Sequence, residues 1–231
     1  MLSTSPFRAT AIDGNLAEAS TASVPARFEL GELWAELVCG RLGVLDHFFS
    51  AERSYLILSW KVSSAVSRPP IRHFHFLEQM LMGVPQKALG IDERVAVSTV
   101  AVACRQCLRF VGMECLPSKA PPLLSALVHA SSGNALSVMP EVFEMEHPRR
   151  LISVTAPRLE SSCAERLSPA EYDVLRQVVE GKSHAEIAQA RAVSERTIAN
   201  QLASVCLALR VSGRLHLINR LLRDGALTQQ A

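Results

Sequence analysis

The feature that most constrains this chain is a stretch near its C-terminus, residues 167–211, with three helix-start signals at short intervals. Ser168 is followed by a proline and, three positions after the serine, by Glu171, the pattern of a capping box with proline at the first helical position. The serine–glutamate spacing recurs from Ser183, and Ser194 precedes a third segment. Aliphatic residues share one side of that segment: Ile198, Leu202, Val205 and Leu209. Short helices joined by a tight turn predict a helix-turn-helix.

Many residues of this stretch agree at fixed offsets with a known pattern. They are Leu167, Ser168, Pro169, Glu171, Val174, Leu175, Gly181, Lys182, Ser183, Glu186, Ile187, Ala188, Val193, Ser194, Arg196, Thr197, Ile198, Asn200, Leu202, Leu209 and Val211. With them, residues 167–222 resemble the DNA-binding domain of LuxR/GerE-type bacterial transcription regulators. The resemblance implies a four-helix domain at 164–225 that binds double-stranded DNA with helix 194–208 in the major groove. It also implies a homodimer, because members of the family commonly dimerise through the fourth helix.

Several candidate DNA contacts follow from the direction of the third helix. Arg196 can pair with phosphate or guanine, and Asn200 with adenine or phosphate. Thr197 lies near the helix N-terminus, where a hydroxyl and a backbone N–H can hold a phosphate. The full candidate set, with contacts at neighbouring helix ends, is Lys182, Ser194, Glu195, Arg196, Thr197, Ala199, Asn200, Gln201 and Arg214. For an exposed Arg or Lys, the alternative is a solvated surface charge.

Four positions depart from the family pattern. Ala199 and Ala208 stand where the family usually has basic residues, Gln201 where it has His, and Arg210 where it has Gly. Loss of basic residues weakens phosphate binding. These departures keep a second hypothesis open, in which the chain is a protein-interaction adaptor or dimerisation module that no longer binds DNA.

An upstream segment repeats the pattern 98 residues earlier, with Gly83 at the position of Gly181. The other matched pairs are Leu77/Leu175, Gln79/Gln177, Leu81/Val179, Leu89/Ile187, Val95/Val193, Thr99/Thr197, Val100/Ile198 and Ala101/Ala199. We therefore predict a divergent helix-turn-helix at 72–113, with helices at 74–82, 85–91 and 98–110 and with Ser98 as the cap of the third. A plain helical bundle is the alternative, because small and aliphatic residues dominate the matches.

The upstream segment offers its own candidate DNA contacts. Thr99, Arg105 and Arg109 lie away from its apolar side, and the two arginines are four residues apart on one side of the helix. Ala101 and Val102, at the early recognition positions, are apolar. A scaffolding or dimerising role is therefore as compatible with this segment as DNA contact.

The rest of the chain predicts a mobile tail at 1–27 and an α+β domain at 28–157. Within that domain we expect the segments that follow, in chain order: a helix at 28–49, a strand at 54–60, a helix at 121–130 and a hairpin from 142–146 to 151–155, with 55–58 as a third strand. The predicted fold class is mostly α with a small β-sheet.

Composition adds few constraints on function. The net charge of +2 and the pI of about 8.3 are only mildly basic, below the values above ~9 typical of strongly basic nucleic-acid binders. Residues 1–26 contain no apolar core segment, and no apolar run reaches the ~18 residues of a membrane span. We therefore expect a cytoplasmic protein without membrane contact.

No pattern in the sequence points to catalysis. The motifs HExxH and GxSxG and the phosphate-binding loop do not occur, and we expect no enzyme, cofactor or metal. Cys104 and Cys107 have the CxxC spacing of some metal and redox sites, but they fall on the apolar side of a predicted helix, which favours packing. We find neither the acidic cluster of a phosphorylatable receiver nor an autoinducer-pocket arrangement, so the sequence assigns no input signal or small-molecule ligand.

Overall fold

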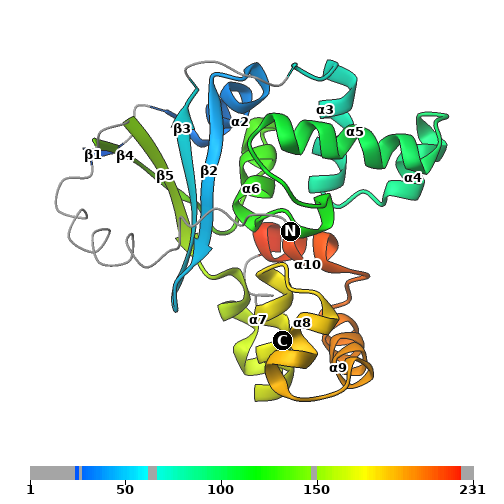
Figure 1. Ribbon diagram of the computed structural model, residues 1–231. Helices are drawn as coiled ribbons and strands as arrows, with labels where there is room; N and C mark the ends of the chain where they lie inside the picture. Colours follow the sequence, from blue (N-terminus) through cyan, green and yellow to red (C-terminus); the bar gives the residue numbers. More distant parts are fainter. Residues whose placement is uncertain (1–23, 26–27, 62–66, 147–149, 225–231) are drawn as a thin grey trace, which may run out of the picture.

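The computed structural model describes residues 24–25, 28–61, 67–146 and 150–224 (Figure 1). Its elements, in chain order, are β1 (Val24–Pro25), α2 (Leu30–Cys39), β2 (Leu42–Phe49), β3 (Arg53–Trp60), α3 (Ile71–Leu81), α4 (Gln86–Asp92), α5 (Val97–Phe110), the 3-10 helix η2 (Pro117–Lys119), α6 (Pro122–Ser131), β4 (Glu141–Glu146), β5 (Arg150–Pro157), the 3-10 helix η3 (Leu159–Arg166), α7 (Pro169–Val179), α8 (His184–Arg191), α9 (Glu195–Ala208) and α10 (Arg214–Asp224). Apart from β1, the predicted tail of 1–27 lies outside the described residues. The mostly α-helical class with a small sheet is confirmed.

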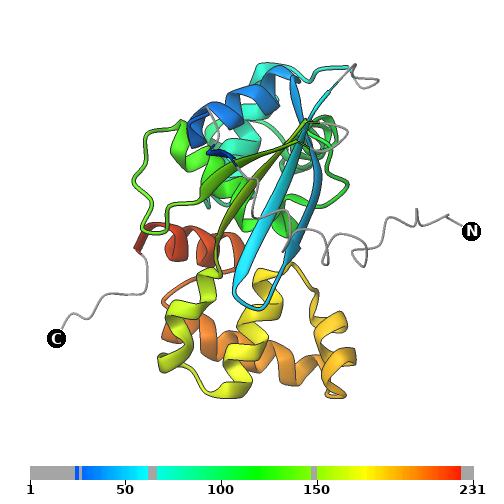
Figure 2. The ribbon, with the colours of Figure 1, turned by 90° about the vertical axis from the view of Figure 1, so that its left-hand side faces the viewer.

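The strands form one antiparallel sheet in the order β1-β4-β5-β3-β2. Val154 of β5 lies between Val142 of β4 and Leu56 of β3, so the predicted hairpin and its third strand are confirmed. The helices α2, α3, α5 and α6 lie on one side of this sheet (Figures 1 and 2). Leu56, Ile152 and Val154 are fully buried in the resulting core.

The predicted single helix at 28–49 is wrong in its second half. Helix α2 ends at Gly40, which has a left-handed backbone with φ of +78°, and β2 follows and pairs with β3 along its length. The apolar residues of β2 have a spacing that resembles that of a helix, because a β-bulge lies between Val44 and Asp46. The bulge breaks the two-residue alternation and leaves Leu45 58% exposed.

The helices α3, α4 and α5 form one three-helix unit, here called the upstream unit. The helices α7, α8 and α9 form a second one, the C-terminal unit, with a similar backbone arrangement. Each upstream helix begins 98 residues before its counterpart, and α3 and α5 also end at that offset from α7 and α9. The three helices predicted within 72–113 are therefore confirmed in position. Positive backbone φ angles occur at matching places: +92° at Gly83 and +90° at Gly181, and +55° at Arg94 and +52° at Ala192.

Backbone hydrogen bonds follow the same repeat. Val95 donates to the Gly90 carbonyl at 2.9 Å, and Val193 donates to the Ala188 carbonyl at 3.1 Å. Each bond closes the turn before the third helix of its unit. The two units therefore share the conformation of their turns as well as the positions of their helices.

The caps of the two third helices differ. The hydroxyl of Ser194 accepts the Thr197 N–H at 3.1 Å, whereas Ala96 stands at the start of α5 and offers no side-chain acceptor. The prediction that Ser98 caps this helix is wrong, because α5 begins at Val97 and Ser98 falls within its first turn.

Helix α10 packs between the upstream and C-terminal units (Figure 1). Ile218 and Leu222 are buried in the apolar cluster of the C-terminal unit, and Leu215 packs against the cluster of the N-terminal region. The amide of Asn219 donates to the carbonyls of Leu81 at 2.8 Å and Leu215 at 2.7 Å. The apolar side of this helix is thus occupied within its own chain.

The difference between the two caps yields a paired prediction for stability. Ser194→Ala should lower the free energy of unfolding by about 1 kcal/mol, because a backbone N–H of the first turn loses its acceptor. Ala96→Ser should raise it by about 0.5–1 kcal/mol, because Ala96 (φ −63°, ψ 144°) has the extended backbone of Ser194 (φ −75°, ψ 150°). Urea unfolding of the full chain measures both changes. Equal stability of Ala96→Ser and the parent chain would contradict the shared capping geometry.

Candidate nucleic-acid interface

The C-terminal unit is built on two capping boxes. Ser168 with Glu171 begins α7, and Ser183 with Glu186 begins α8, as the sequence predicts. Hydrogen bonds from the hydroxyls of Ser204 and Ser168 lower the pKa of Glu171, and the Ser204 bond ties α7 to α9. Hydrogen bonds from the Ser183 hydroxyl and backbone N–H lower the pKa of Glu186 to about 2. Both carboxylates are therefore charged at neutral pH, beside the helix N-termini that favour negative charge.

Arg191 fixes α8 against its two neighbouring helices. Its guanidinium donates to the Gln201 side-chain oxygen of α9 at 2.8 Å and lies 3.3 Å from a carboxylate oxygen of Asp173 in α7. Gln201 is half-buried by this contact. The structure therefore places Gln201 inside the unit, as a support for the angle between helices, and away from the outward face of α9.

The outward face of α9 carries a stripe of mostly uncharged residues. Arg196, Asn200, Ala203 and Leu207 are exposed and recur at helical spacing, with exposed Ala199 beside them. Their opposite side, with Ile198 and Val205, is fully buried. Among the described residues, none hydrogen-bonds or ion-pairs with the side chains of Arg196 or Asn200. These two polar groups therefore face outward without an internal partner.

The first turn of α9 is held in place by its cap. Ser194 and Thr197 are both exposed, and their hydroxyl oxygens lie 2.9 Å apart. Exposed Glu195 adds a negative charge beside Arg196. This acidic side chain makes the helix start less attractive to phosphate than the family resemblance alone implies.

Lys182 is exposed at the start of the α7–α8 turn. Its ammonium lies 3.2 Å from a carboxylate oxygen of Glu180 and 3.3 Å from the Gln177 side-chain oxygen. The pair is solvent-accessible, so its contribution to stability is small. To bind a phosphate, the Lys182 ammonium must leave the Glu180 carboxylate.

Arg214 is half-buried, and its guanidinium is bonded within the chain, so a contact with phosphate would require it to give up these partners. The guanidinium is largely buried and donates to the carbonyls of Val178, Val179, Ser118 and Ala120 at 2.6–2.9 Å. Burial lowers its pKa to about 10, so the group still carries its charge at neutral pH. A cation at the carbonyl end of α7 is favourable, and Arg214 joins that end to η2.

The upstream unit presents a different surface at the equivalent positions. Val102 takes the place of Asn200, and it is 46% exposed. Arg105 and Arg109 are exposed further along α5, and Thr99 is exposed in its first turn. The exposed polar side chains of α9 are thus concentrated near the start of the helix, whereas the exposed arginines of α5 lie towards its end.

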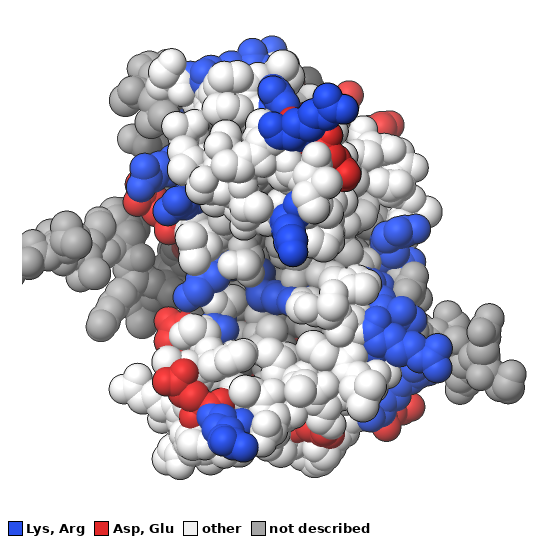
Figure 3. Space-filling model, turned by 90° about the vertical axis from the view of Figure 1, so that its right-hand side faces the viewer, with Lys and Arg blue, Asp and Glu red and all other residues white. Residues whose placement is uncertain are grey.

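Figure 3 views the molecule from the side on which α4 and α9 lie. Most atoms on this face are uncharged, and the basic atoms are spread over it, some of them in the hollow between its upper and lower parts. A nucleic acid on this face would be held by a small number of ionic contacts.

Cys104 and Cys107 lie in the core and not in a binding site. Both side chains are fully buried, and burial raises the pKa of each thiol to about 12. Thiols of this kind are weak metal ligands and weak nucleophiles at neutral pH. Among the described residues, no group of three or more His, Cys, Asp or Glu side chains is placed to hold a metal ion. No described helix is long and apolar enough to span a bilayer.

Comparison with known proteins assigns the C-terminal part of the chain. Residues 165–221 match the family model described as bacterial regulatory proteins, luxR family. This confirms the resemblance read from the sequence, and it covers α7, α8, α9 and most of α10. A search of curated proteins and a search of solved structures gave no match.

The role of Arg214 yields a second stability prediction. Arg214→Lys should lower the free energy of unfolding by about 1–3 kcal/mol, because a single ammonium cannot serve carbonyls on both α7 and η2. Arg210→Lys is the matched control, since Arg210 is exposed, and its effect should stay within about 0.5 kcal/mol. Urea unfolding of the two variants is the measurement. An Arg214→Lys chain as stable as the Arg210→Lys chain would show that Arg214 is not a structural clamp.

Proposed function

We propose that this chain, whose C-terminal part is a LuxR-type helix-turn-helix, is a transcription regulator that binds double-stranded DNA through α9. One observation carries the proposal: Arg196 and Asn200 project from the outward face of α9 without an internal partner, at the positions that the family pattern directs towards DNA. Such a regulator acts on bacterial DNA in the cytoplasm. We propose no catalytic step for it.

In the proposed complex, α9 lies in the major groove. Arg196 pairs with guanine or a phosphate, and Asn200 pairs with adenine or a phosphate. Ala199 and Ala203 leave room for close approach of the helix to the bases, and an alanine methyl can contact the methyl group of thymine. Ser194 and Thr197 offer hydroxyls at the helix N-terminus to a phosphate. Gln201 supports the helix from inside.

We propose that the upstream unit is a divergent helix-turn-helix that makes a second, mainly ionic contact with DNA. The repeated turn geometry supports this assignment, together with the exposure of Arg105 and Arg109. These cations and Thr99 would touch the phosphate backbone, whereas Val102 offers no polar group for base readout. On this proposal the region at 28–157 and the domain at 164–225 act together on one duplex.

A homodimer formed through α10 would require this helix to leave its present position. Ile218 and Leu222 of α10 are covered by the C-terminal unit, and the Asn219 amide is bonded to α3. Two recognition units within one chain supply a different way to contact neighbouring sites on DNA. We therefore propose that one chain engages both sites before any dimer forms.

The adaptor hypothesis has its own supporting observation. Leu207, near the end of α9, is 81% exposed, and Ile91 and Val102 of the upstream unit are 67% and 46% exposed. Exposed apolar side chains on both third helices suit a protein partner as well as DNA bases. The salt dependence of duplex binding separates the two functions.

The first test is a salt titration of duplex binding. The logarithm of the association constant should fall linearly with the logarithm of salt concentration, by about 0.9 per phosphate contact. Arg196→Ala combined with Asn200→Ala should remove specific binding and leave the helix content unchanged. Arg68→Ala, which removes an exposed charge outside both third helices, is the control and should bind like the parent chain. If the parent chain binds no duplex in a salt-dependent way, the adaptor function replaces the proposal.

The second test concerns the upstream unit. Arg105→Ala combined with Arg109→Ala should reduce the magnitude of the salt slope by about 2, because two phosphate contacts are lost. The preference among duplex sequences should stay the same, because α9 still reads the bases. Fluorescence anisotropy at several salt concentrations measures both quantities. An unchanged slope would reject a DNA contact by α5.

A further inference from the structure

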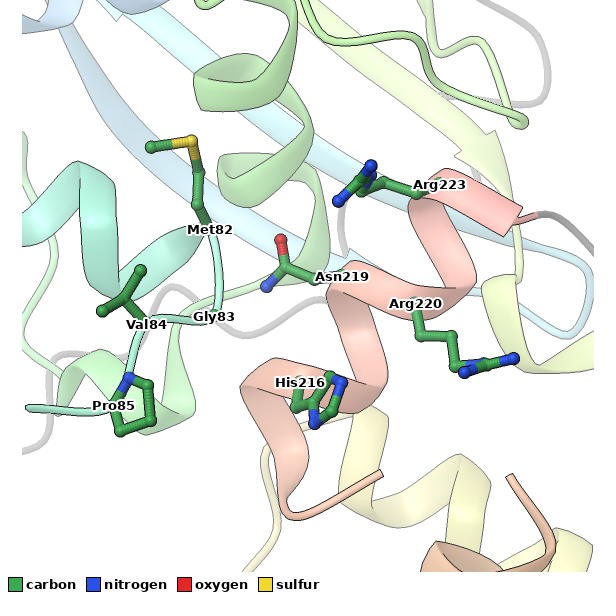
Figure 4. Close-up of a pocket in the computed structure, with 8 residues that line it drawn as sticks. All are labelled: Met82, Gly83, Val84, Pro85, His216, Asn219, Arg220 and Arg223. Carbon is green, nitrogen blue, oxygen red and sulfur yellow. The ribbon is translucent and has the colours of Figure 1, made fainter. Parts of the chain in front are cut away.

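A pocket of about 420 Å³ lies between the α3–α4 turn and α10 (Figure 4). The residues that line it are Met82, Gly83, Val84 and Pro85 on one side and His216, Asn219, Arg220 and Arg223 on the other. One wall thus belongs to the upstream unit and the other to the helix that follows the C-terminal unit. The volume falls within the range of ~300–1,000 Å³ typical of small-molecule sites, which often form where two parts of a protein meet.

The α10 wall is positively charged. His216, Asn219, Arg220 and Arg223 recur at the spacing of one helix face, and all four line the pocket. In Figure 4 the two arginine side chains leave α10 in different directions, and that of Arg220 extends away from the Met82–Pro85 wall. No described Asp or Glu lines the pocket. Guanidinium groups bind phosphates and carboxylates through charge-assisted hydrogen bonds. The charge of the wall therefore selects for an anion.

The centre of that wall is held in place by a buried polar network. Asn219 is only 5% exposed, and its amide donates to the carbonyls of Leu81 and Leu215. Its side-chain oxygen is hydrogen-bonded to the Nε2 of buried His129, whose Nδ1 lies 3.3 Å from the Asn134 amide. Because every polar atom of the Asn219 side chain is engaged, α10 cannot turn about its axis without breaking these bonds. The basic side chains therefore project from a fixed helix.

The opposite wall depends on a glycine. Gly83 has a φ of +92°, and a Cβ at this position would lie 3.2 Å from the Asn219 amide nitrogen. Glycine thus permits both the turn and its close approach to α10. The pocket beside this contact follows from the way the two parts meet and not from a loose loop.

His216 adds a directional donor at the mouth of the pocket. The backbone N–H of Ser212 lies 3.2 Å from the Nδ1 of His216, so Nδ1 is the acceptor nitrogen of the neutral ring. The proton of the neutral ring is then on Nε2, which is left as a donor. A ligand oxygen at Nε2 would gain one more hydrogen bond.

We propose that this pocket binds a small molecule that carries phosphate or carboxylate groups, held by Arg220, Arg223 and His216. The ligand bridges the α3–α4 turn and α10, so its binding stabilises the contact between the two helix-turn-helix regions. The site is separate from the outward face of α9, and the inference holds whether or not α9 binds DNA.

The test is calorimetric titration of the full chain with pyrophosphate, with citrate and with uncharged glucose. We expect saturable binding of at least one anion with one site per chain, and none of glucose. Arg220→Gln combined with Arg223→Gln should weaken that binding at least about tenfold. Arg68→Gln combined with Arg210→Gln removes the same charge outside the pocket and should leave the affinity unchanged. Preference for pyrophosphate or for citrate identifies the ligand as a phosphate or a carboxylate compound.

A second variant tests the pocket without changing its charge. Val84→Trp should fill the pocket and remove binding, and the thermal unfolding temperature should then no longer rise with the anion. Circular dichroism establishes whether each variant is folded. If Val84→Trp does not fold, the anion affinity of the Arg220→Gln and Arg223→Gln double variant decides the test. The proposal is overturned if neither anion binds at about 10 mM, or if the pocket arginine pair and the control pair bind equally.

Discussion

Side chains of helix α10 donate hydrogen bonds to the last carbonyl of the first helix in both three-helix units. The relative position of the two units depends on these hydrogen bonds. Arg214 donates to the carbonyl of Val179, the last residue of α7, and Asn219 donates to that of Leu81, the last residue of α3. These carbonyls stand at equivalent places in the repeat. Terminal carbonyls have no partner within their helix, and a buried one without a partner would be costly. One helix therefore sets how the two units lie relative to each other.

The same placement of α10 creates the pocket and buries the apolar side of the helix within the chain. The side of α10 with Ile218 and Leu222 is buried, while the side with Arg220 and Arg223 borders the α3–α4 turn. Apolar burial holds the helix in place, and the charged side borders the pocket. A small molecule in the proposed site would touch the helix that contacts both three-helix units.

The two three-helix units share a backbone but differ in the side chains they present. Ser194 caps α9 where Ala96 leaves α5 uncapped, and Asn200 is replaced by Val102. The two units thus share the backbone geometry of the turn and differ in the exposed side chains of the third helix. The proposed division of labour, base readout by α9 and ionic contact by α5, follows from this difference.

Local signals in the sequence determined the helices of both units, because glycines with positive φ and apolar spacing act within a few residues, and in the C-terminal unit capping serines add to them. The family resemblance came from the same local pattern. Long-range contacts decided the rest. Residues 42–49 are a strand because β3 pairs with them, and Arg214 is a clamp because η2 and α7 bring carbonyls around it. The pocket beside Asn219 likewise forms only where residues 82–85 and α10 come together. No pattern within either segment alone predicts that contact.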